Sequence, residues 1–214
     1  ALFVILIGYW AAFALYPAPG ENYDYEAVGV PADWPHLMEG FEAHWNKNAN
    51  LAHAVDVQFL NLFPRPEPFK YHGGGYQTLS FIPTLGTMIM GLIAGMLLRS
   101  HHEPLTKVGR LLLLGVTFLT VGLALEYSGV CPLVKRIWTP SFAIYSGGWC
   151  FIILATLYFW IDVIGWKAVA FPFIVIGMNS IAIYVMDWTF AKLVHDVLES
   201  HFGWLLHRVD PAYY

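Results

Sequence analysis

The feature of the sequence that most constrains the fold is an uncharged run from Gly74 to Leu98. At 1.5 Å of rise per residue, a helix over this run is about 37 Å long, enough to cross a hydrocarbon core of about 30 Å. We therefore predict that it spans a membrane. Thr87, Gly91 and Gly95 recur at every fourth position and share one face of this helix. That face is interpreted either as a seam for close helix packing or as the lining of a pore or site.

Composition extends this prediction to the whole chain. Hydrophobic residues make up 57% of the sequence and charged residues 12%, against a usual charged fraction of about 25%. The mean hydropathy is +0.55. We predict an all-α fold, a polytopic transmembrane helical bundle embedded in the lipid bilayer. The net charge of −4 offers no basic patch, so nucleic acid is not expected as a partner.

The apolar blocks divide the chain into segments. A bundle domain over residues 1–188 contains spans at about 1–16, 74–98, 111–126, 139–161 and 168–188. Residues 189–214 follow as an amphipathic segment whose three histidines are interpreted as surface groups: His195, His201 and His207. The chain opens inside an apolar run without a methionine, and we interpret it as the later portion of a longer protein.

Charge predicts how the spans are oriented. The short connection after Leu98 contains Arg99, Lys107 and Arg110, which is typical of a cytoplasmic loop. The long loop 17–73 contains eight acidic and three basic residues, which favours the opposite side. We therefore predict a multi-pass protein of a bacterial inner membrane, with loop 17–73 in the periplasm.

The long loop is too rich in large apolar residues to be a solvated linker. Asn50 is suited to cap a helix in which Leu51, Val55, Phe59 and Leu62 recur at helical spacing. The loop is expected to fold back as a lid over the outer face of the bundle. Its last part, NLFPRPEPFKYHGGGY, is interpreted either as a rigid segment that positions Arg65 and Glu67 or as a simple connector.

A few polar groups near or within the spans are candidate binding residues. Lys135 and Arg136 lie beside Trp138 on the predicted outer side, where basic residues are either an anion contact or interfacial anchors. Asn179 and Ser180 lie midway along the last span and are expected to face the bundle interior. An interhelical hydrogen bond of about 1 kcal/mol is the structural alternative for Asn179. Tyr145 lies in the small, polar outer half of the fourth span.

Five segments in one order resemble the bacterial membrane proteins related to heparan-alpha-glucosaminide N-acetyltransferase, a family of transmembrane acyltransferases. They are HWNKNAN, NLFPRPEPF, GGGYQTLSFIPTLGTMIMGLIAG, KRIWTPSFAIYSGGWC and IGMNSIAIYVM. The resemblance runs from Ala1 to about Trp188. It implies that acetyl-CoA supplies an acetyl group from the cytoplasm and that an amino sugar or related glycan accepts it on the far side. The implied partners are the bilayer, acetyl-CoA and the acceptor, with a homo-oligomer as an option and no metal.

The essential histidine of this family lies in an early loop of the type HAxWNG, followed by a span of the type DLVFPWFVF. Neither string occurs in this chain, and the HWNKN segment at His44 lacks the span that should follow. No catalytic residue is therefore assigned, and the family histidine is expected upstream of Ala1. The binding candidates are Asn179, Ser180, Tyr145, Lys135, Arg136, Arg65 and Trp138.

Two other classes of function are compatible with the residues. A transporter or flippase for a glycolipid or small molecule also uses glycine-containing helices and a polar group at mid-membrane. A non-catalytic membrane subunit needs neither acetyl-CoA nor a histidine. Turnover of acetyl-CoA separates the acyltransferase from both.

Overall fold

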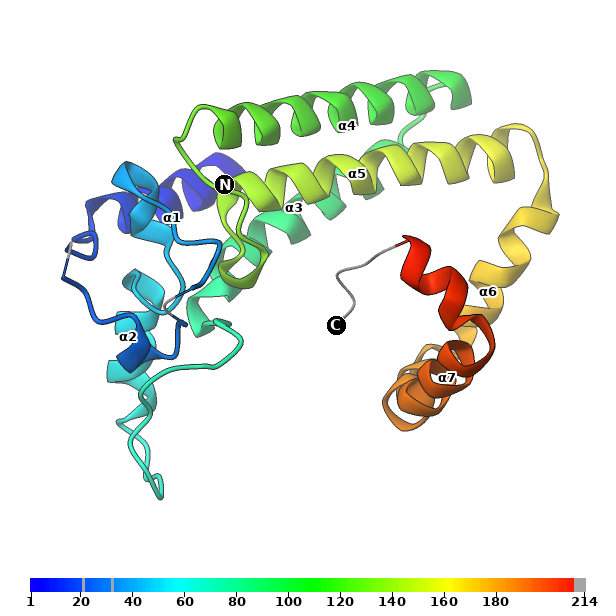
Figure 1. The fold of residues 1–214 in the computed structure, drawn as a ribbon. Coiled ribbons are helices and arrows are strands. Elements are labelled where there is room, and N and C mark those ends of the chain that lie inside the picture. Colours follow the sequence, from blue (N-terminus) through cyan, green and yellow to red (C-terminus); the bar gives the residue numbers. More distant parts are fainter. Residues whose placement is uncertain (21, 32, 210–214) are drawn as a thin grey trace. The chain divides into compact units, whose positions relative to one another are not determined.

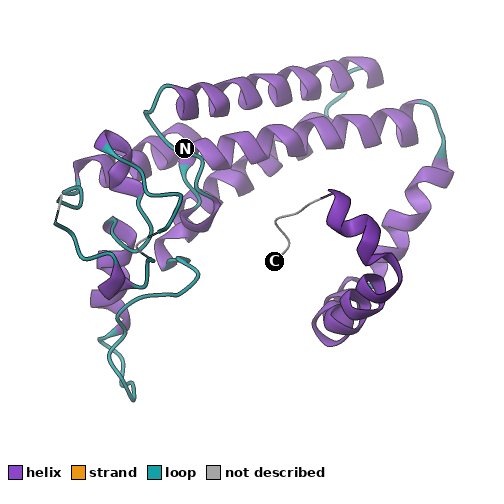
Figure 2. Ribbon diagram, in the orientation of Figure 1, coloured by secondary structure: helices purple, strands orange, loops and turns teal. Residues whose placement is uncertain are grey.

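The computed structural model describes residues 1–20, 22–31 and 33–209. These residues form helices, turns and loops, with no β-strand among them, as Figure 2 shows. The α-helices are α1 (Leu2–Leu15), α2 (Leu51–Leu60), α3 (Phe81–Arg99), α4 (Pro104–Tyr127), α5 (Pro140–Tyr158), α6 (Ala170–Met178) and α7 (Ser180–Val209), shown in Figure 1. The predicted all-α fold is confirmed. The chain divides into two compact units, Ala1–Phe159 and Trp160–Tyr214.

Helix lengths in the described chain support a polytopic membrane protein. Three stretches are long and apolar enough to cross a bilayer: Thr78–Arg99, Pro104–Tyr127 and Pro140–Val163. A fourth crossing is provided if the bent pair Ala170–Met178 and Ser180–His201 acts as one span. α1 is apolar but has only 14 residues, fewer than the roughly 20 that a full crossing needs.

The helix boundaries differ from the predicted spans at three places. α4 begins at Pro104 and not near Leu111, because proline is well suited to the first turn of a helix. In the predicted span 74–98, the helical part begins at Thr78, after the glycines Gly73, Gly74 and Gly75. α7 runs on through residue 188, where a separate C-terminal segment was predicted to begin. Residues 210–214 of that predicted segment lie outside the described residues.

Close packing of α4 against α5 forms the centre of the first unit. Gly115 on α4 faces Gly148 on α5, and a methyl group on Gly148 would lie 2.8 Å from the Gly115 carbonyl oxygen. Met90 and Ala94 of α3 complete an apolar core with residues of α4 and α5: Leu111, Phe151 and Ala155. Glycine at these two positions lets the backbones approach, as is common between membrane helices.

The face that α3 uses for packing is not the predicted one. Its buried residues are Pro83, Gly86, Met90 and Ala94. Gly91 and Gly95 have no other group of the described chain within 4 Å of where a side chain would begin. The seam predicted through Thr87, Gly91 and Gly95 is therefore wrong for this unit, because the helix is rotated so that the neighbouring stripe is buried.

Much of loop 17–73, here called the cap, packs against α1 and the segment before α5, while residues 61–71 project from it. A second apolar core joins this loop to α1 and to the segment before α5, and it contains Tyr9, Phe13, Trp45, Ala52 and Ile137. Asn50 caps α2 as predicted, since its side-chain oxygen accepts a hydrogen bond from the backbone N–H of His53. The buried face of α2 contains Ala52, His53 and Asp56, whereas Phe59 of the predicted apolar stripe is exposed.

The second unit is a pair of helices that break at Asn179. The chain bends by 80° between α6 and α7. The side-chain amide of Asn179 donates to the Val175 carbonyl at 2.9 Å, and its backbone N–H bonds to the carbonyls of both Val175 and Ile176. This local bonding competes with the regular ladder of the helix. The region predicted as one crossing over 168–188 is bent near its centre.

Candidate binding cavity

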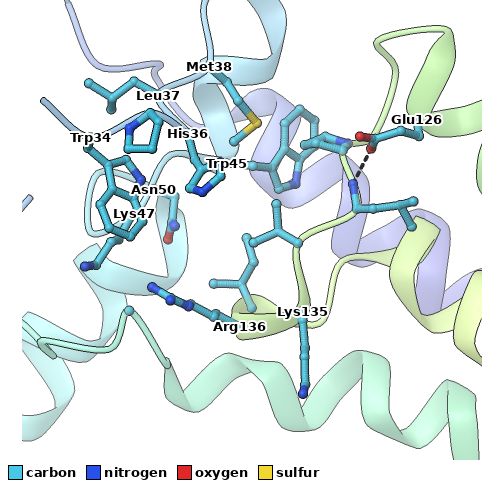
Figure 3. Close-up of a pocket in the computed structure, with 16 residues that line it drawn as sticks. Trp34, His36, Leu37, Met38, Trp45, Lys47, Asn50, Glu126, Lys135 and Arg136 are labelled. Atoms are coloured by element: carbon cyan, nitrogen blue, oxygen red, sulfur yellow. Dashed lines mark hydrogen bonds between the residues drawn. The ribbon is translucent and has the colours of Figure 1, made fainter. Parts of the chain in front are cut away.

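A cavity of about 480 Å³ lies between the cap and the segment that joins α4 to α5. This volume is within the range of small-molecule sites. Figure 3 shows Arg136 directed toward Trp34, Lys47 and Asn50 of the cap, whereas the Lys135 side chain points away from them. It is lined by Trp34, Pro35, His36, Leu37, Met38, Trp45, Lys47, Asn50, Gly75, Glu126, Pro132, Leu133, Val134, Lys135, Arg136 and Ile137.

Three alternate asparagines lie in the part of the cap beside the cavity, and one of them, Asn50, lines it. Asn46, Asn48 and Asn50 are all buried. The amide of Asn46 donates to the Met38 carbonyl and accepts from the Met38 N–H, both at 2.9 Å, which fixes the segment that carries Trp34 and His36. The amide of Asn50 donates to the Asn46 carbonyl at 2.9 Å. Buried amides satisfied in this way hold a loop in one conformation.

Asn48 connects two further parts of the cap. Its amide nitrogen donates to the carbonyl of Val28 at 2.9 Å and to that of His72 at 3.1 Å. Its backbone has a φ of 53°, in the left-handed region that asparagine tolerates better than most residues. The HWNKNAN segment thus has a structural role, with Lys47 held between two anchored asparagines.

Two cations lie against one indole ring in the cavity. The Lys47 ammonium is 4.4 Å from the centre of the Trp34 ring, and the Arg136 guanidinium carbon is 5.7 Å from it. Burial lowers the pKa of Lys47, and the positive charge of Arg136 lowers it further. Gly75 has a φ of 73°, and a methyl group there would lie 3.0 Å from Cγ of Lys47, so glycine leaves room for the lysine stem.

The basic segment opposite the cap is held by α5 and α3. Lys135 and Arg136 belong to the 3-10 helix Lys135–Ile137, which ends at Trp138 with a φ of 52°. The Trp138 indole donates to the hydroxyl of Thr87 on α3 at 3.1 Å. After it, Thr139 accepts from the Val134 N–H at 3.0 Å, and Ser141 donates to the Pro132 carbonyl at 2.7 Å. The IWTPS segment therefore positions the two cations.

The cavity is electrostatically unbalanced. Among the described residues, no carboxylate lies within ion-pair distance of Lys47, Lys135 or Arg136. Glu126 lines the cavity, but its carboxylate accepts a hydrogen bond from the Leu133 N–H, as Figure 3 shows. Cations gathered in a cavity without matching carboxylates favour an anionic ligand, since carboxylate, sulfate and phosphate oxygens accept from guanidinium and ammonium groups.

The structure brings together only some of the predicted binding residues. Lys135 and Arg136 line the cavity, and Trp138 supports them. Tyr145 lies on α5 against Gly122 of α4, away from the cavity lining. Asn179 and Ser180 belong to the second unit, where both are exposed within the described chain.

Arg65 is also outside the cavity. It lies on an exposed loop after α2, with its guanidinium carbon 5.3 Å from the ring centre of Phe69. His44 does not line the cavity either, and its Nδ1 is 2.7 Å from the Phe41 carbonyl oxygen. No group of three or more His, Cys, Asp or Glu side chains in the described chain is arranged to hold a metal ion.

Of the residues that line the cavity, sequence reasoning named only Lys135 and Arg136 as binding candidates; the rings of Trp34 and His36 and the ammonium of Lys47 are among those it missed. The Trp34 and His36 rings are in edge contact, with centres 5.5 Å apart. A signal for Lys47 was present, because it lies inside the HWNKNAN segment already quoted for the family resemblance. Nothing in the spacing of residues 34–36 indicated that they would meet residues 135 and 136.

Comparison with known proteins agrees with a membrane acetyltransferase relationship. The chain is 27% identical over 217 aligned residues to human heparan-alpha-glucosaminide N-acetyltransferase. The alignment covers 94% of this chain and 30% of the human enzyme, so the chain spans less than a third of that relative. No family model and no solved structure matches the chain. The similarity supports relatedness to the human enzyme along nearly the whole of this chain.

Proposed function

We propose that the chain is part of a membrane acetyltransferase that transfers an acetyl group from cytoplasmic acetyl-CoA to an amino sugar or related glycan on the opposite side. The observation that carries this proposal is similarity to an N-acetyltransferase over 94% of the chain. The candidate spans and the cavity at the ends of α4 and α5 support it. The loop 17–73 would then be periplasmic and the protein would lie in a bacterial inner membrane.

We further propose that the cavity holds the acceptor through a negatively charged substituent. Lys47, Lys135 and Arg136 supply donors for a carboxylate, sulfate or phosphate group. An anion there would also relieve the repulsion between Lys47 and Arg136 that contributes to the lowered pKa of Lys47. Binding of this kind orients an acceptor but does not by itself break the thioester bond.

The chemical step needs further groups. The amine must lose a proton as its nitrogen bonds to the acetyl carbon, and donors must stabilise the oxyanion that forms before the thiol of CoA leaves. Asn179, Ser180 and Tyr145 are proposed as hydrogen-bond donors, with acetyl-CoA as co-substrate. No catalytic residue is assigned within this chain.

Transfer of label from acetyl-CoA in membranes that contain the full-length protein tests the proposal. Glucosamine 6-sulfate and unmodified glucosamine serve as the two acceptors. With Arg136→Gln we expect KM for the sulfated acceptor to rise about tenfold, since a charge-assisted hydrogen bond is worth about 1.5–3 kcal/mol, with little change for glucosamine. Lys70→Gln is the control, because Lys70 is an exposed cation of loop 17–73 that does not line the cavity.

The experiment separates failure of the acetyltransferase proposal from failure of the anion-recognition proposal. No transfer to either acceptor would contradict the acetyltransferase. Transfer with equal loss for both acceptors in Arg136→Gln would contradict anion recognition alone. Unchanged transfer in Asn179→Ala, at matched expression, would assign Asn179 to packing.

A glycolipid or small-molecule transporter is the second candidate, and the bend at Asn179 favours it. Transporter sites are typically formed where a membrane helix is interrupted near mid-membrane. α6 and α7 are interrupted in this way, with an 80° bend. A transporter, like a non-catalytic subunit, would leave acetyl-CoA unhydrolysed and unbound, whereas the acetyltransferase consumes it.

A further inference from the structure

The loop that follows α2 is a rigid projection, here called the arm and defined as residues 61–71. Asn61 closes its base: the side-chain nitrogen donates to the Phe69 carbonyl at 2.9 Å, and its oxygen accepts from the Phe69 N–H at 2.7 Å. The same nitrogen donates to Val57 of α2 at 2.8 Å. Pro64, Pro66 and Pro68 restrict the backbone between these points. Figure 1 shows the arm extending beyond the end of α2.

Large apolar side chains at the root of the arm have no cover within the described chain. Leu62 is 77% exposed, Phe63 is 56% exposed and Phe59 is 45% exposed. The Phe59 and Phe63 rings are in edge contact, with centres 5.4 Å apart. Burying a side chain of this size is worth about 1.5–3 kcal/mol, so the cluster is well suited to an apolar surrounding.

The root of the arm lies close to the outer end of a membrane span. Both carboxylate oxygens of Asp56 accept from the backbone N–H of Thr78, at 2.9 and 3.2 Å, and Thr78 begins the span Thr78–Arg99. That span has 22 residues and is about 33 Å long, so Thr78 lies near the edge of the hydrocarbon core. Phe59 follows Asp56 by three residues on α2, about 4.5 Å along the helix, and Leu62 lies two residues after α2 ends at Leu60.

The polar groups of the arm suit a lipid headgroup layer. Arg65 and Lys70 are exposed cations, and Glu67 is the acidic residue between them. Tyr71 and Tyr76 are exposed next to the same span end, as aromatic residues of interfacial belts are. Guanidinium and ammonium groups bind phosphate oxygens, and basic residues near a membrane surface are attracted to anionic lipids by about 1 kcal/mol each.

We propose that the arm and Phe59 form a membrane-interface anchor, which buries Phe59, Leu62 and Phe63 at the boundary between headgroups and acyl chains. Arg65 and Lys70 contact lipid phosphates in the same leaflet. The occupant is phospholipid and not a second copy of the chain. Three side chains offer far less than the roughly 800 Å² per partner of a stable protein interface, and the bilayer edge is within reach.

Depth measurement on the intact protein in vesicles tests the anchor. Leu62→Cys in a Cys150→Ser background is labelled with an environment-sensitive fluorophore; Cys131 is buried and does not compete. The protein is reconstituted in phosphatidylcholine and phosphatidylglycerol. A nitroxide on the lipid chain should quench the label at least twofold more than it quenches the same label in Glu39→Cys, an exposed position in the polar part of the loop.

Other outcomes overturn the proposal. Stronger quenching by iodide in water than by the lipid nitroxide at position 62 would place the arm in solvent. Self-quenching that grows with the number of protein copies per vesicle would identify a second copy as the occupant. With Arg65→Gln, the preference for phosphatidylglycerol over phosphatidylcholine should weaken, and an unchanged preference would remove the lipid contact from Arg65.

Discussion

At the scale of single residues, Asn48 joins three parts of the cap. It is fully buried, donates to two backbone carbonyls and has a left-handed backbone. Asn48→Ala leaves both carbonyls without that donor and puts alanine in a left-handed conformation that asparagine tolerates better, so we expect a loss of about 2–4 kcal/mol in unfolding free energy. Asn48→Gly removes the same hydrogen bonds without the backbone strain and should lose less. Thermal unfolding in detergent compares them; equal losses would contradict a role for the backbone.

Lys47 provides a prediction about pH at the same scale. Burial and Arg136 both lower its pKa, so the folded protein releases this proton below pH 10.5 while the unfolded chain retains it. Stability from this group therefore increases as pH rises through that window. In Arg136→Gln the pKa of Lys47 should rise toward the ordinary value without reaching it, since burial remains. Slower acetic anhydride labelling of Lys47 at a fixed pH, measured by mass spectrometry against Lys70, would show this; an unchanged rate would contradict coupling to Arg136.

Single-residue chemistry was only partly predictable from the sequence. The asparagine cap at residue 50 follows from local geometry and is confirmed. Lys135 and Arg136 were noticed because positive charge is unusual on the side of the membrane predicted for them. Trp34 and Lys47 could not be placed beside them, because about ninety residues separate these segments and the pairing depends on the fold of the whole cap.

At the scale of elements, the α4 and α5 pair depends on backbone contact. A methyl group on Gly148 would lie 2.8 Å from both the Gly115 oxygen and the Leu119 nitrogen, atoms that cannot turn away. Gly148→Ala should therefore lower the unfolding free energy by about 1–3 kcal/mol. Gly95→Ala on α3 is the matched control, since no group of the described chain lies within 4 Å of where its methyl group would be. Alanine is favoured over glycine in a helix by about 1 kcal/mol, so the unfolding free energy of this variant should be unchanged or higher. Thermal unfolding of both variants measures these changes. Equal changes in the two variants would contradict close packing at Gly148.

The same elements show why helix packing was harder to predict than helix existence. Long apolar runs identify α3, α4 and α5, because span length is fixed by the bilayer. Which small residues face a neighbour depends on helix rotation, and hydrophobicity gives no guide where all faces are apolar. The close contacts between α4 and α5 are at Gly115, Gly122 and Gly148. The bend at Asn179 likewise follows from local amide bonding within an uninterrupted apolar block.

At the scale of the whole molecule, the direction of the proposed acetyl transfer depends on which side of the membrane the cavity faces. α3 and α4 are joined by residues 100–103, so the cap and the 128–139 segment adjoin the opposite ends of these two helices. Arg99, Lys107 and Arg110 near the short loop predict that this loop is cytoplasmic. Single cysteines at Glu39 and Glu103, in a Cys150→Ser background, report the two sides through a maleimide that cannot cross membranes.

We expect Glu39→Cys to react in intact spheroplasts and Glu103→Cys to react only after the membrane is permeabilised. Labelling of both positions from the same side would contradict α3 as a complete crossing and with it the bundle. Labelling with the sides exchanged would leave the bundle intact but place the cationic cavity in the cytoplasm, where it would meet acetyl-CoA and not an external acceptor. The location of Glu39 therefore decides whether Lys47 and Arg136 act on the acceptor, because the cavity and the cap share one side of the membrane.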